Sequence, residues 1–290
     1  MSYCKWGVCV MMVVLMFSCV MAAANGAASG LTFRTVVFPN SQSTAVLGIN
    51  NAGAMVGSYL DSKEMWHGFE IAHGKATTID DPNGTGTYCF AINNNGDIAG
   101  QYTTARQTLQ AFLYSGGKFT DISPAGSTSS QALGINDLGA VDGNFVDSAG
   151  VHGFLFDGTS YTTIDVPGAA YTLGGGINNA GLMTEVWLDE EGDSHSSLYD
   201  GTNFTTIDVP DAEDSSAGAI DSAGDVVFSW EDENDTYFGD LLHGGKYLKF
   251  SDASGSRTFA YGMNDQRMIV GAFTTSSGVN GGIRGEVLMD

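Results

Sequence analysis

One short phrase recurs six times at nearly constant spacing through most of this 290-residue chain. Its first copy, residues 48–53, reads Gly-Ile-Asn-Asn-Ala-Gly, and its second position is always apolar: Ile49, Ile92, Ile135, Ile177, Ile220 and Met263. The successive intervals are 43, 43, 42, 43 and 43 residues. Repetition at a fixed period of this size is the signature of stacked or ring-forming structural units. We therefore expect six equivalent units.

Other residue types keep the same period. An aromatic residue stands ten positions after each apolar one, at Tyr59, Tyr102, Phe145, Trp187, Trp230 and Phe273. All five prolines share one repeat position: Pro39, Pro82, Pro124, Pro167 and Pro210. We expect the aromatic residues to fill the apolar layer between neighbouring units and the prolines to end a strand, where no further ladder donor is needed.

Each unit contains four short strand-like segments separated by turn residues. Residues 41–47 and 54–59 typify the first two segments, and residues 152–156 and 161–166 typify the third and fourth. The Asn-Asn-x-Gly and Asp-Gly sequences between them tolerate the positive φ angles of tight hairpins. Four strands in about 43 residues, repeated six times, predict an all-β fold, a six-bladed β-propeller with four-stranded blades.

The phase of the repeat predicts how the ring closes. Residues 33–38 match the fourth strand of a unit, and residues 285–290 match a third strand. The sixth blade therefore lacks a strand that the N-terminal segment can supply. We expect residues 33–38 to pair with residues 286–289, because this pairing removes the open edge of the last sheet.

The first 28 residues differ from the repeats. Lys5 precedes an apolar run over residues 6–21, and a small-residue stretch follows at 22–28, which is typical of a secretory signal peptide. We predict a signal peptide over residues 1–28 and the propeller domain over 29–290. A membrane anchor and a lipoprotein modified at Cys19 are the alternatives. After cleavage we expect no transmembrane segment, and Cys89 becomes the single cysteine, so no internal disulfide can form.

Charge narrows the classes of partner. The chain has 33 acidic residues and 11 lysine or arginine residues, a formal net charge of −22. Such a field repels nucleic acid and anionic membrane surfaces and attracts cations. We therefore expect no nucleic-acid partner.

The repeat resembles the bacterial extracellular HAF repeat. The best copy joins His152-Gly153-Phe154-Leu155 to Thr162-Thr163-Ile164-Asp165, and blades five and six depart from it with Phe238 and Arg284 in place of the histidine. This resemblance covers nearly all of the chain after the leader. It implies an exported repeat protein, secreted or held in the cell envelope, and no defined chemistry.

The histidines suggest a metal site only at first sight. His67, His152 and His195 occupy one repeat position, so a rotation of the propeller separates them too widely to share a zinc ion. We expect them to be structural hydrogen-bonding residues. His73 and His243 fall at turns, and we expect both to be solvated.

Blades four and five break the sixfold pattern with acidic loops between their second and third strands. Alternate acids in such loops can surround a hard cation such as Ca²⁺, which takes 6–8 oxygen ligands. The candidate metal ligands are Asp189, Glu191, Asp193, Glu231, Glu233 and Asp235. The plainer alternative is a pair of solvated acidic hairpins. Both blades also exchange the strand glycine of Gly57, Gly100, Gly143 and Gly271 for another residue, Glu185 or Phe228.

The same end of the blades should carry the link between blades four and five. The candidate ligand-binding residues are Trp187, Trp230, Asp211, Glu213 and Asp214. We predict a noncatalytic, monomeric propeller that binds an unknown protein or polysaccharide through this face, with Ca²⁺ ordering the loops. The alternative is a secreted hydrolase of glycosidase or phosphoester type that uses these carboxylates.

Overall fold

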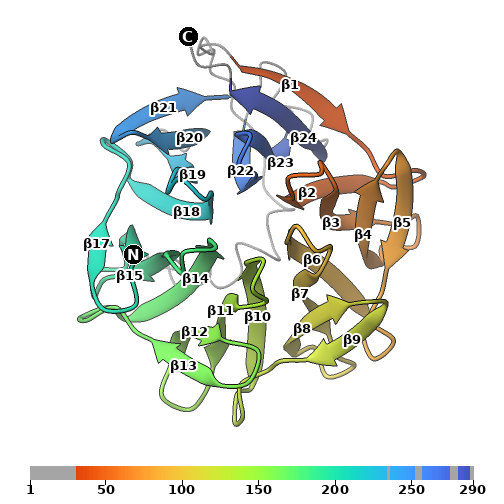
Figure 1. Cartoon of the computed structure of the whole chain (residues 1–290), viewed down its shortest axis with the longest axis horizontal. Helices are drawn as coiled ribbons and strands as arrows, with labels where there is room; N and C mark the ends of the chain where they lie inside the picture. Colours follow the sequence, from red (N-terminus) through yellow and green to blue (C-terminus); the bar gives the residue numbers. More distant parts are fainter. Residues whose placement is uncertain (1–30, 234–235, 252–256, 275–279, 288–290) are drawn as a thin grey trace, which may run out of the picture.

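The computed structural model describes residues 31–233, 236–251, 257–274 and 280–287. In these ranges the chain forms six antiparallel four-stranded sheets arranged around a central axis (Figure 1). The predicted six-bladed β-propeller is confirmed. The predicted signal peptide at 1–28 and the candidate ligand Asp235 lie outside the described residues. No helix within these ranges is long and apolar enough to cross a bilayer.

The first three blades follow one another along the chain, each with its first strand innermost (Figure 1). Blade one contains β2 (Ser43–Ile49), β3 (Met55–Leu60), β4 (Trp66–Ala72) and β5 (Lys75–Ile79). Blade two contains β6 (Gly86–Ile92), β7 (Ile98–Thr103), β8 (Leu109–Ser115) and β9 (Lys118–Asp121). Blade three contains β10 (Ser129–Ile135), β11 (Val141–Val146), β12 (Val151–Phe156) and β13 (Tyr161–Ile164).

The last three blades complete the ring. Blade four contains β14 (Tyr171–Ile177), β15 (Met183–Leu188), β16 (Ser194–Tyr199) and β17 (Phe204–Thr206). Blade five contains β18 (Asp214–Ile220), β19 (Val226–Glu231), β20 (Tyr237–His243) and β21 (Lys246–Phe250). Blade six contains β22 (Arg257–Met263), β23 (Met268–Thr274), β24 (Asn280–Val287) and the N-terminal β1 (Leu31–Val36).

The small residues of the innermost strands are required by the crowding around the axis. A Cβ atom on Gly48 would lie 2.7 Å from the Phe90 carbonyl oxygen, and one on Gly134 would lie 2.7 Å from the Gly176 Cα atom. Both contacts are shorter than van der Waals packing allows. The inner strands of neighbouring blades therefore approach each other backbone to backbone, which explains why the recurring phrase begins with glycine or alanine.

Six apolar clusters fill the interfaces between neighbouring blades, each with residues from both sides. Tyr59, Tyr102, Phe145 and Trp230 belong to these clusters, as expected for the recurring aromatic position, whereas Trp187 and Phe273 do not. The interfaces are not equal. Between blades three and four the buried members of the cluster are only three, Ile164, Ile177 and Met183.

The terminal clasp is present, with a different register from the one predicted. β1 pairs antiparallel with β24, from Leu31 opposite Val287 to Val36 opposite Gly282. The paired residues are thus 31–36 and 282–287, where the sequence predicted 33–38 and 286–289. The difference arises because β24 starts earlier than the sequence pattern indicated. Residues 288 and 289 lie outside the described part of the chain.

The clasp is fitted closely enough to test. A Cβ atom on Gly285 would lie 2.6 Å from the Phe33 ring, which itself packs against Phe250 at a centroid distance of 5.6 Å. We expect Gly285→Ala to lower the free energy of unfolding by about 1–3 kcal/mol through overpacking. In a Phe33→Ala background the same change should cost about 1 kcal/mol less, because the obstacle is gone. Urea unfolding of the double-mutant cycle checks this, and strictly additive effects would contradict it.

Candidate functional site

The structure brings the acidic segments of blades four and five together at one end of the propeller. The Ser194 backbone N–H, at the end of the blade-four loop, donates to Asp214 Oδ1 at 3.1 Å. The Glu213 N–H donates to the Glu231 carbonyl at 3.0 Å, and Asp214 lies opposite Glu231 in the sheet. We call residues 189–193, 211–214 and 231–233 the acidic face.

The acidic face is rich in carboxyl groups. Its three segments contain ten acidic residues and no lysine or arginine. Six of the acids are exposed: Glu190, Glu191, Asp193, Asp211, Glu213 and Glu233. Carboxylates at this density create a local field that attracts cations and offers many hydrogen-bond acceptors to a ligand.

Asp189 has a structural role that the sequence analysis did not predict. Its Oδ1 accepts the Asp193 N–H at 2.9 Å, and this bond holds the pKa of Asp189 below its ordinary value. Its Oδ2 lies 3.5 Å from His195 Nε2. Asp61 and Asp147 hold the same turn and histidine in blades one and three. Each stands twelve residues after the apolar repeat residue, so the spacing carried this signal.

The geometry for a metal ion is not preformed here. Among the residues that the structure describes, no group of three or more histidine, cysteine, aspartate or glutamate side chains is arranged to hold a metal. A bound cation would therefore have to draw the exposed carboxylates of the acidic face together. Calcium binding by Asp189, Glu191, Asp193, Glu231 and Glu233 stays a prediction.

The two tryptophans are built into the blades. Trp187 stacks on His195 at a centroid distance of 4.4 Å, and its indole N–H donates to Ser197 Oγ at 3.0 Å. Trp230 is buried, and the Lys249 ammonium lies 4.3 Å from its ring centroid. Of the two, only Trp187 keeps part of its surface exposed beside the acidic face.

The repeated histidines make structural contacts, as expected. The Nδ1 atoms of His67, His152 and His195 each lie 2.8 Å from an aspartate of the following strand end, in one shared arrangement. His73 is exposed, as expected, whereas His243 is only partly exposed. Its Nδ1 lies 2.7 Å from Asp225 Oδ2, because the neighbouring turn carries a buried carboxylate.

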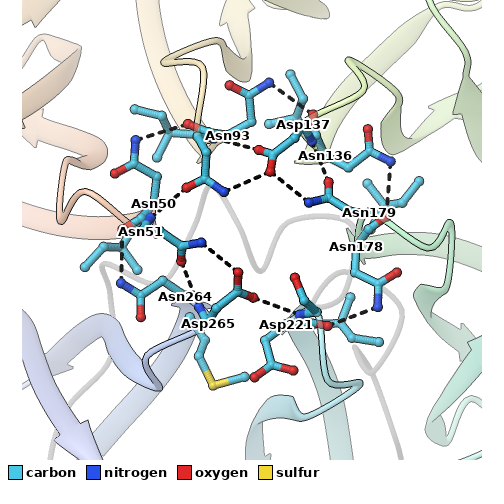
Figure 2. A pocket seen from close by; sticks show the side chains of 18 residues that line it. Asn50, Asn51, Asn93, Asn136, Asp137, Asn178, Asn179, Asp221, Asn264 and Asp265 are labelled. Carbon is cyan, nitrogen blue, oxygen red and sulfur yellow. Dashed lines mark hydrogen bonds between the residues drawn. The ribbon is translucent and has the colours of Figure 1, made fainter.

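A hollow opens at the opposite end of the propeller, where the recurring Asn-Asn turns surround the channel mouth (Figure 2). A side-chain amide from one blade donates to a backbone carbonyl of the next, at distances of 3.0–3.1 Å, from Asn50, Asn93, Asn136, Asn178 and Asn264. The same side chains accept backbone N–H groups of their own turns, as Asn50 Oδ1 does from Ala52 and Ala54. These asparagines therefore join the blades into a ring.

Asp221 interrupts that ring between blades five and six. An ionised carboxylate has no N–H to donate to the Asn264 carbonyl, and burial raises the pKa of Asp221, with the charges of Asp225 and Asp265 adding to the rise. A bridge elsewhere joins the same two blades: Arg267 Nε donates to Asp225 Oδ2 at 2.9 Å.

Two further carboxylates, Asp137 and Asp265, lie across the channel mouth from each other (Figure 2). Asp137 Oδ2 accepts side-chain amides of Asn94 and Asn179 at 2.9 and 2.8 Å. Burial opposes the ionisation of Asp265, but hydrogen bonds from Asn51 and Ser222 outweigh it and hold its pKa below the ordinary value. These acids are engaged in ring closure, so the acidic face is the stronger candidate for binding a ligand.

The interruption at Asp221 predicts a stabilising substitution. Asp221→Asn keeps the Oδ1 acceptor of the turn and adds the amide donor that the other blades possess. We expect a gain of about 1 kcal/mol in unfolding free energy at neutral pH. The gain should shrink in acid. A group with a raised folded-state pKa stabilises the fold most at low pH, so the parent chain itself becomes more stable there and the difference between the two chains falls. Urea unfolding checks this, and the reverse change Asn178→Asp is the control that should destabilise.

Comparison with known proteins supports the fold. No protein-family model matches this chain, and no curated protein matches its sequence. The SapL1 lectin, solved in complex with α-methyl fucoside, matches with a TM-score of 0.56 and 13% identity, over 86% of this chain and 97% of that chain. The fucose-specific lectin from Aleuria aurantia matches with a TM-score of 0.53 and 13% identity, over 89% of this chain and 99% of its own.

A putative gluconolactonase is also similar, with a TM-score of 0.53 and 13% identity over 89% of this chain and 92% of its own. Lectins and a presumed enzyme thus share one architecture with this chain. At such low identity the likeness shows the six-bladed propeller fold and nothing more specific.

Proposed function

We propose that this chain is an exported, noncatalytic propeller that binds an extracellular saccharide polymer through the acidic face. The observation that carries the proposal is the convergence of three acidic segments, which contain no lysine or arginine, in blades four and five, where the loops depart from the pattern of the other blades. Export and the resemblance to HAF repeats belong to the same proposal.

The chemistry of the acidic face suits a polyhydroxylated ligand. Carboxylates accept hydrogen bonds from sugar hydroxyls, and the partly exposed edge of Trp187 adds an apolar surface beside them. An anionic polymer would need a bridging cation, which is the role proposed for Ca²⁺. The lectin neighbours fit a binding role, since one is fucose-specific and the other was solved in complex with α-methyl fucoside.

The hydrolase alternative draws its main support from the gluconolactonase-like neighbour. Glycoside hydrolysis needs two carboxyl groups at a set separation around the scissile bond. In the acidic face Asp189 and Asp214 already accept backbone N–H groups, so neither is poised as a free acid or base. We therefore place binding ahead of catalysis.

A glycan array followed by calorimetry tests the proposal. We expect saccharide binding that falls at least tenfold in the triple variant Glu190→Gln, Glu191→Gln, Glu213→Gln, since exposed acceptors are lost. The matched control is Glu64→Gln with Glu70→Gln in blade one, which removes charge elsewhere and should bind like the parent. A blank array at high protein concentration, or equal loss in both variants, would contradict the assignment of this face.

Calcium association has its own test. If Ca²⁺ binds the folded chain, saturation at 100 times the Kd adds about 2.7 kcal/mol of stability, which for a chain of this size raises Tm by roughly 5–10 °C. We expect EGTA to reverse the rise and Glu191→Gln with Asp193→Asn to abolish it. An identical Tm in CaCl₂ and in EGTA removes calcium from the proposal and leaves saccharide binding standing.

A further inference from the structure

The interface between blades three and four holds two fully buried carboxyl groups. Asp142 on β11 and Glu185 on β15 are both 0% exposed. The apolar cluster is smallest at this same interface, where its buried members are Ile164, Ile177 and Met183. Acidic side chains therefore occupy space that apolar side chains fill between the other blades.

The two carboxyl groups cross the interface in opposite directions. Asp142 reaches into blade four, where a Cβ atom on Gly174 would lie 2.5 Å from its Oδ1. Glu185 reaches into blade three, where a Cβ atom on Gly153 would lie 3.2 Å from its Oε2. Gly174 is also the cross-strand partner of Glu185. The two acids are thus neighbours, and glycines make room for both.

A cross-strand exchange explains how Glu185 came to be buried. Blades one to three pair a glycine of the second strand with a phenylalanine of the third: Gly57 with Phe69, Gly100 with Phe112, and Gly143 with Phe154. Blade four pairs Glu185 with Ser197 instead. The glutamate side chain takes the volume that a phenylalanine ring occupies in blades one to three.

This pair lacks the partners that buried charges need. Asp142 Oδ2 accepts the Gly175 N–H at 3.1 Å, but Asp142 Oδ1 and both Glu185 carboxyl oxygens have no hydrogen-bond partner. The surrounding strands, β10–β12 and β14–β16, contain no lysine or arginine. Two uncompensated carboxylates would be strongly destabilising at such a site, so a proton or a cation must neutralise at least one.

The other titratable groups of these strands do not compensate the pair. They are His152, Tyr171, His195 and Tyr199. Both histidines are held by aspartates of their own, Asp165 and Asp208. Burial raises the pKa of Glu185 well above its ordinary value, and the charge of Asp142 raises it further. Burial likewise raises the pKa of Asp142, although backbone N–H groups of Gly175, Gly143 and Gly176 favour its ionised form.

We propose that Glu185 is a buried proton-binding site, held as a neutral carboxylic acid whose O–H donates a hydrogen bond to Asp142 Oδ1 across the interface between blades three and four. One proton enters from solvent on Glu185 as the interface closes, and Asp142 keeps the negative charge under its backbone donors. When the interface opens, the proton returns to solvent. The interface therefore tightens in acid and weakens in alkali.

The direction of the pH effect follows from linkage. A carboxyl group with a raised folded-state pKa stabilises the fold most in acid, and this contribution is lost as pH rises through the folded-state pKa. Glu185→Gln supplies a permanent amide donor of nearly the same shape. Between the ordinary glutamate pKa and the raised folded-state pKa, the parent chain should lose stability as pH rises, while Glu185→Gln should not. Over this range we expect the ratio of the folding equilibrium constants, Glu185→Gln over parent, to rise about tenfold per pH unit. Glu70→Gln, a strand glutamate of blade one, is the matched control and should run parallel to the parent.

Urea unfolding of the three full chains from pH 5 to pH 9 measures this, with and without EDTA. Infrared spectroscopy of the folded parent chain supplies a second readout that needs no variant to fold. It should show a protonated-carboxyl band near neutral pH that Glu185→Gln removes. Parallel pH curves for parent and Glu185→Gln, or absence of the band, would overturn the proposal. A parent stability that collapses in EDTA at neutral pH would also overturn it, because a cation rather than a proton would then neutralise the pair.

Discussion

The hydrogen bond from an asparagine side chain to the backbone of the next blade is the interaction on which the ring depends. One amide does two tasks, since its oxygen shapes the turn of its own blade and its nitrogen reaches the neighbouring carbonyl. Such a bond fixes the distance and rotation between blades at the most crowded radius, where glycine and alanine let the inner strands meet. The apolar side chains farther from the axis then pack into a space of fixed width between neighbouring blades.

The six gaps are filled differently, and the differences are concentrated in one arc of the ring. Blades three and four enclose carboxyl groups in place of apolar side chains, and blades five and six replace one asparagine link by the Asp225–Arg267 bridge. The acidic face lies over blades four and five, between these two atypical interfaces. Burial within the regular blades supplies stability that lets this arc carry charge and polar groups.

The fold was predictable because the same apolar, aromatic, proline and turn positions recur in the blades. Each of these patterns is weak in one copy, but six copies together are decisive. The position of Asp189 was predictable from the same spacing, but its chemistry was masked by the acids around it. The pairing of Glu185 with Asp142 was not predictable. It depends on strand register and on which face of a sheet packs against the next blade. Neither property can be seen as a residue type that recurs at a fixed spacing in the sequence. The register of the clasp was predicted wrongly for the same reason, because it depends on which residues of β1 and β24 lie opposite each other.

The clasp also bears on how such a chain can change its number of blades. Because β1 completes the sheet begun by β22 to β24, the boundary of the genetic unit does not coincide with the boundary of a blade. A tandem duplication of about 43 residues starting anywhere inside the array adds one whole blade and leaves both ends of the closing strand pair in place. The number of blades can therefore change without changing the strand pair that closes the ring. Internal blades are free to diverge in sequence, while β1 and β24 must stay matched to each other.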